Sequence, residues 1–112
     1  MPIEKWSDTV VLVQLADDPQ FGDDLAALDQ TIGGKPLDVV LNFSAVHFIN
    51  SSNIARLLRL RKQLVTTNGR LVLCGISTQV WGAFLVTGLD KLFDFSDNVP
   101  TALATLQMTS KR

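Results

Sequence analysis

Apolar residues near the middle of the chain alternate between short continuous runs and helical spacings. Residues 39–43 and 71–74 form brief runs of aliphatic and β-branched residues, the pattern of strands buried on both faces of a parallel sheet. Between these runs, apolar side chains recur at spacings of three, four and seven residues, which predicts a helix with one buried side. Its predicted buried positions are Ile54, Leu57, Leu58, Leu64 and Val65.

The N-terminal third predicts a hairpin followed by a helix. Residues 3–6 and 9–15 flank Ser7-Asp8, a short polar break of the kind that joins two strands. Asp17-Asp18-Pro19 then predicts a capped helix with the proline at its first helical position. The apolar positions of this helix, which ends at a glycine pair, are Phe21, Leu25, Leu28 and Ile32.

The C-terminal third predicts two more helices with a strand between them. Ser77 is placed to cap the first of these helices, and Gly88 ends it. Residues 92–95 form a brief strand, after which Asp97 or Asn98 caps a final helix. The predicted order is ββαβαβαβα. It indicates one α/β domain over residues 1–112, with an ordered core at about 3–107 and helices covering a mostly parallel sheet.

Composition narrows the functional classes. The 112-residue chain has a net charge of −1 and 46% hydrophobic residues, so no overall positive field draws it to nucleic acid. No apolar run approaches the roughly 18 residues of a membrane span, and the N-terminus does not resemble a signal peptide. The single Cys74 lies in a buried strand pattern and has no internal disulfide partner. These features favour the cytosol.

The most informative polar stretch is Asn50-Ser51-Ser52-Asn53, which lies where the central strand gives way to its helix. Side-chain oxygens there can accept from the free N–H groups of the first turn, and the helix dipole favours negative charge at the same place. A phosphate on Ser51 is therefore well placed. The alternative is that Ser51 and Ser52 serve only as caps and turn formers.

The sequence gives little support for a metal site, a catalytic serine or a nucleotide-binding site. His47 is the single histidine and has no cysteine cluster beside it, so no zinc site is expected and an exposed loop position is favoured. No G-x-S-x-G elbow surrounds Ser51, which disfavours a serine hydrolase. Because no phosphate-binding loop is encoded, neither a nucleotide nor another cofactor is expected, and no residue is assigned a catalytic role.

Two features suggest a docking surface. Arg56, Arg59 and Lys62 repeat every three residues along the predicted second helix and begin one turn after the serines. They form either a solvated face or a surface for an acidic partner. Trp81, in the third helix, is either a core residue or an exposed anchor beside that surface.

Taken together, these segments resemble the sulfate-transporter and anti-sigma-factor-antagonist (STAS) domain, specifically the free-standing bacterial anti-sigma-factor antagonists. The run VVLNFSAVHFINSSNIARLLRLRK is similar to the central strand, Asp-Ser-Ser-Gly turn and following helix of that family. GRLVLCGIS, VTGLDKLFDF and DNVPTALATL resemble the segments that follow it. The resemblance covers nearly the whole chain.

The resemblance implies a non-enzymatic switch. In that family, an anti-sigma factor related to histidine kinases phosphorylates the first serine of the turn, and a metal-dependent phosphatase reverses the reaction. Carried over, Ser51 is the phosphoacceptor and Ser52 its neighbouring cap, with Arg56, Arg59, Lys62 and Trp81 on the partner surface. The unphosphorylated domain is the form expected to bind the anti-sigma factor.

Two positions depart from the family pattern. Asn50 stands where an aspartate is usual, and Asn53 stands where a glycine is usual. An amide brings no negative charge, so the transfer of phosphate is expected to be slow or absent if that carboxylate assists it. The alternative function is a constitutive STAS subunit of a larger assembly, such as a lipid ABC transporter complex or a signalling scaffold.

Overall fold

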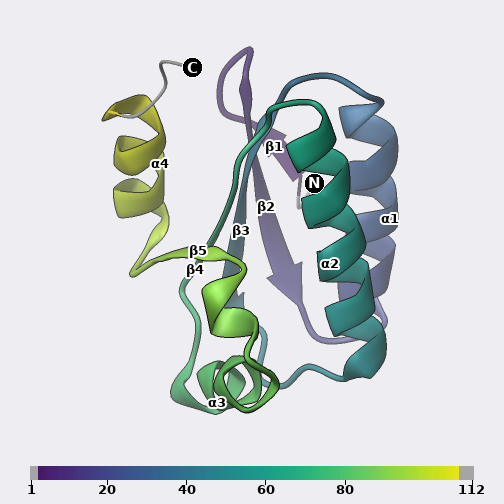
Figure 1. The fold of residues 1–112 in the computed structure, drawn as a ribbon, viewed down its shortest axis with the longest axis vertical. Helices are drawn as coiled ribbons and strands as arrows, with labels where there is room; N and C mark the ends of the chain where they lie inside the picture. The colour runs from purple at the N-terminus through teal and green to yellow at the C-terminus, as the bar shows by residue number, and fades with distance from the viewer. Residues whose placement is uncertain (1–2, 109–112) are drawn as a thin grey trace.

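The computed structural model describes residues 3–108, which form one five-stranded sheet with the strands in sequence order. β1 pairs with β2 as an antiparallel hairpin, and the remaining neighbours are parallel (Figure 1). The predicted α/β fold with its N-terminal hairpin is confirmed. The strands are β1 (Ile3–Lys5), β2 (Val10–Ala16), β3 (Asp38–Ala45), β4 (Leu71–Cys74) and β5 (Asp94–Ser96).

Helices cover both faces of the sheet, as predicted. α1 (Gln20–Ile32) and α2 (Ser51–Thr66) lie on one face and α4 (Val99–Met108) on the other (Figure 1). α3 (Thr78–Thr87), followed by the 3₁₀ turn η1 (Leu89–Lys91), lies at the carboxyl edge of the parallel strands. None of the helices in the described part of the chain combines the length and apolar character needed to cross a membrane.

The core divides at the sheet. The larger half lies beneath α1 and α2, where Phe43 of β3 contacts Phe21 and Phe84 with ring centroids 5.9 and 6.3 Å apart. The smaller half lies beneath α4 and includes Cys74. Burial raises the pKa of the Cys74 thiol to about 11. This residue therefore acts as a small apolar side chain and not as a reactive thiolate.

The structure differs from the sequence predictions at three places. Pro19 is the N-cap of α1 and not its first residue, and no side chain caps that helix. On α2, Leu60 is buried while Val65 is 57% exposed, because the buried side is centred on residues 57, 60 and 64. The last strand is Asp94–Ser96 and not residues 92–95, because Leu92 is the C-cap of the 3₁₀ turn that precedes it.

Candidate functional site

The polar stretch after β3 starts α2 at the carboxyl edge of the sheet. Asn50 is extended, with φ −121° and ψ 179°, and serves as the N-cap. Its Oδ1 accepts from the backbone N–H of Asn53 at 2.9 Å, while Asn53 Oδ1 accepts from the backbone N–H of Asn50 at 3.0 Å. The two asparagines thus form a reciprocal capping box, which fixes the first turn of α2.

The two serines lie within this turn with exposed side chains. Within residues 3–108, no hydrogen bond engages the hydroxyl of Ser51 or Ser52. The prediction that Ser52 acts as a cap is therefore wrong, because Asn50 already occupies that role. Ser51 is the first residue of α2, and its hydroxyl faces solvent at the positive end of the helix dipole.

An acidic loop between β2 and α1 completes the site. Asp18 Oδ2 accepts from Asn50 Nδ2 and from Asn53 Nδ2, each at 3.1 Å. The sequence prediction assigned this aspartate to the start of α1 and missed the contact. A signal was present, because Asp18 follows β2 and Asn50 follows β3, and the carboxyl ends of parallel neighbours meet at one edge.

His47 lies in the loop before the turn and contacts the other aspartate of the acidic loop. Its backbone N–H donates to Asp17 Oδ1 at 2.8 Å, and its ring Nδ1 lies 2.8 Å from Asp17 Oδ2. The backbone bond, and then the ring, hold the pKa of Asp17 below its usual value. His47 is exposed, as predicted. The described residues contain no cluster of three or more side chains suited to a metal ion.

The His47→Ala variant is expected to raise the pKa of Asp17 only in part, because the backbone N–H at residue 47 remains. Folding lowers the pKa of Asp17, so the contact stabilises the folded protein at pH values above the pKa of the unfolded state, near 3.8. This stabilisation is lost as the pH falls through the pKa of the folded state. Carbon-13 NMR titration of the Asp17 carboxyl measures the change. If the pKa of Asp17 in the variant rose fully to that of the unfolded state, the backbone N–H of residue 47 would not be the main cause of the lowered pKa.

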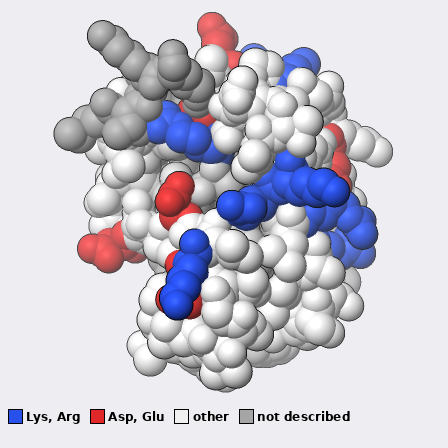
Figure 2. Space-filling view, viewed as in Figure 1, with Lys and Arg blue, Asp and Glu red and all other residues white. Residues whose placement is uncertain are grey.

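The predicted docking side of α2 is exposed and basic. Arg56, Arg59 and Lys62 are exposed, and α2 contains no acidic residue. Figure 2 shows Lys and Arg side chains gathered over this helix. The Arg56 guanidinium reaches across to α1, where it lies beside Gly22. The basic side chains therefore begin more than one turn after Ser51 and follow one side of the helix.

Trp81 is half-buried in α3, so it packs against the core and leaves part of its side chain exposed. Its ring packs edge to face on Phe95 with centroids 4.9 Å apart. The stretch 75–89 around it carries no charged side chain, and two residues of α3 expose apolar surface, with Leu85 51% and Val86 89% exposed. An uncharged surface with exposed apolar side chains thus lies at the carboxyl edge, where α2 also begins.

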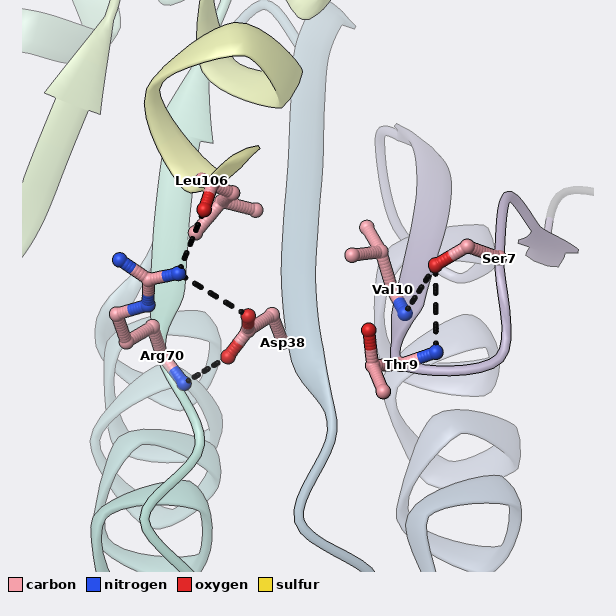
Figure 3. A network of polar contacts seen from close by, with 6 residues as sticks. All are labelled: Ser7, Thr9, Val10, Asp38, Arg70 and Leu106. Carbon is pink, nitrogen blue, oxygen red and sulfur yellow. Dashed lines mark hydrogen bonds and ion pairs between the residues drawn. The ribbon is translucent and has the colours of Figure 1, made fainter. Parts of the chain in front are cut away.

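A second polar network lies at the opposite edge and holds the fold together (Figure 3). The buried Asp38 at the start of β3 accepts from the backbone N–H of Arg70 at 2.9 Å and from its guanidinium at 3.3 Å. The same guanidinium nitrogen donates to the carbonyl of Leu106 in α4 at 2.9 Å. Because these contacts join the start of β3, the residue before β4 and the last turns of α4, the network fastens α4 to the sheet.

Comparisons with a protein-family model and with solved structures agree with this architecture. The STAS domain model matches residues 9–102. An RsbS variant from Moorella thermoacetica superposes with a TM-score of 0.84 at 21% identity, covering 99% of this chain and 97% of that one. The anti-sigma factor antagonist SpoIIAA in its unphosphorylated form gives 0.78 at 19% identity, covering 98% and 96%. The phosphorylated Bacillus cell fate determinant SpoIIAA gives 0.72 at 19%, covering 93% and 96%.

At these identities the superpositions establish a shared fold. The family match is independent of them and spans most of the chain, from β2 to the start of α4. It contains the whole Asn50–Asn53 turn and all of α2. The chain therefore belongs to the STAS domain family.

Proposed function

We propose that this protein is a non-enzymatic regulatory domain of the anti-sigma-factor-antagonist type, which docks a partner through α2 and is switched by phosphorylation of Ser51. The observation that carries the proposal is the exposed Ser51 hydroxyl at the first residue of α2, more than one turn before the exposed arginines. A phosphate adds about −1.5 to −2 charges. At this position it is stabilised by the helix dipole yet alters the surface that the partner contacts.

The partner that fits this proposal is an anti-sigma factor that is itself a serine kinase related to histidine kinases. A metal-dependent serine phosphatase would restore the binding form. The basic side of α2 favours an acidic surface on the partner, and half-buried Trp81 lies on the uncharged surface at the carboxyl edge. Both reactions belong to the cytosol. SpoIIAA, which shares the fold, has been observed in phosphorylated and unphosphorylated forms.

A second candidate function is a constitutive STAS subunit of a larger assembly, such as a lipid transporter ATPase complex or a scaffold. Asn50 favours it, because the residue beside Ser51 is a neutral amide whose Oδ1 is already bound to the N–H of Asn53. No carboxylate at position 50 is available to orient the Ser51 hydroxyl. Co-purification separates the two functions, since a transporter ATPase indicates the second and a kinase-like anti-sigma factor the first.

Intact-mass analysis of protein recovered from its own host is expected to reveal one added phosphate, mapped to Ser51 within residues 49–56. The Ser51→Ala variant serves as the control and should lose the added mass, whereas Ser52→Ala should retain it. Protein that stays unmodified under every growth condition would contradict the switch and favour the constitutive subunit.

A further inference from the structure

The Asp18 carboxylate lies against both asparagines of the capping box. Its Oδ2 accepts from Asn50 Nδ2 and Asn53 Nδ2 at 3.1 Å, and its Oδ1 lies 3.3 Å from the same Asn53 nitrogen. Each asparagine uses its Oδ1 to accept the backbone N–H of the other. Both amides are thus engaged at both ends, and Asp18 closes a ring of hydrogen bonds around the start of α2.

We propose that Asp18 is the positioning residue of the Ser51 turn, and that a negative charge added at Ser51 weakens its contacts with Asn50 and Asn53. The modification state of Ser51 is thereby transmitted to the loop between β2 and α1. This inference rests on the proposed function, because phosphorylation is the source of the added charge. It goes further by naming a second segment that responds to it.

The charges around the turn set the direction of the effect. Ser51 directly follows Asn50, whose amide is 3.1 Å from Asp18 Oδ2, so a charged group at residue 51 is one residue along the chain from a partner of that carboxylate. Within the described residues, the hydrogen-bond partners of the Asp18 side chain are neutral amides, which do not offset a second negative charge. Like charges in the same turn region repel, whereas the helix dipole alone favours an anion at this position. Asp18 therefore opposes the anion that the helix favours.

The loop that carries Asp18 depends on these contacts. Pro19 is the N-cap of α1 and supplies no side-chain hydrogen bond, so the side chains of Asp17 and Asp18 fasten the loop to the α2 side of the site. If Asp18 releases both asparagines, the paired contacts between Asp17 and His47 remain as the side-chain attachment. The loop and the first turn of α1 are consequently the segment expected to loosen.

A double-mutant cycle on the isolated protein tests the coupling without any partner. Ser51→Glu supplies the added charge, and Asp18→Asn removes the opposing one while keeping the shape of the side chain. We expect Ser51→Glu to lower Tm by about 3 °C more with Asp18 present than with Asn at position 18. Hydrogen exchange should also speed up severalfold at the backbone N–H groups of Asn50 and Asn53 in the Ser51→Glu protein.

Thr78→Glu is the matched control, because Thr78 is the exposed first residue of α3 behind the cap Ser77, in an uncharged stretch. Its effect on Tm should be the same with either residue at position 18. Asp18→Ser repeats the cycle with a second neutral side chain. An additive cycle with unchanged exchange would overturn the role of Asp18, and it would leave phosphorylation of Ser51, measured by mass, unaffected.

Discussion

Replacing Phe43 by alanine is expected to lower the free energy of unfolding by about 3–5 kcal/mol. Phe43 is fully buried in the second half of β3, where its ring contacts Phe21 of α1 and Phe84 of α3 edge to face. Truncation loses the transfer free energy of the ring and leaves a cavity that three elements line. Because β3 leads directly into the loop before Ser51, the same change also weakens the support beneath the candidate site.

Urea unfolding, followed by far-ultraviolet circular dichroism, measures the Phe43→Ala effect as a shift in the transition midpoint. Phe48→Ala is the matched control, since Phe48 lies five residues further along the same segment and is 58% exposed. Its free energy of unfolding should change by no more than about 0.5 kcal/mol. Equal losses in the two variants would show that the ring contacts of Phe43 do not organise the core.

Most of the fold was predictable because local patterns and long-range packing agree in this chain. The buried run at 39–43 is a central strand, and Ser77, Asn98 and Gly88 cap or end helices as their residue types predict. The errors lie where a local signal competes with a contact from another element. The aspartates before Pro19 are acceptable caps by type, but the neighbouring loop supplies better donors in His47 and Asn50.

The candidate site was predictable only on the α2 side. A capping stretch, two serines and a basic helix are contiguous in sequence, so their proximity follows from periodicity alone. Asp18 and Asn53 are 35 residues apart, and their contact depends on the parallel pairing of β2 with β3. The pattern of a single sequence predicts that these two strands pair in parallel. It does not predict how each side chain is oriented at the edge of the sheet.

The paired change Arg56→Glu and Arg59→Glu is expected to raise the Kd for the anti-sigma factor partner roughly a hundredfold. Reversing two exposed charges on a docking helix replaces attraction to an acidic surface with repulsion, and like charges facing each other cost several kcal/mol. About 1.4 kcal/mol corresponds to a tenfold change in Kd. Isothermal titration calorimetry with the kinase-type partner recovered from the host, using unphosphorylated protein, provides the measurement.

Lys5→Glu with Lys35→Glu is the control for this pair, because it gives the protein the same net charge at the opposite edge of the sheet, where β1 ends and β3 is about to begin. Its Kd should stay close to that of the unaltered protein. Raising the salt concentration should weaken the unaltered complex but not the complex of the arginine variant, because screening reduces an attraction in the first and a repulsion in the second. If the arginine variant binds as tightly as the control, α2 is a solvated helix face and the partner docks elsewhere.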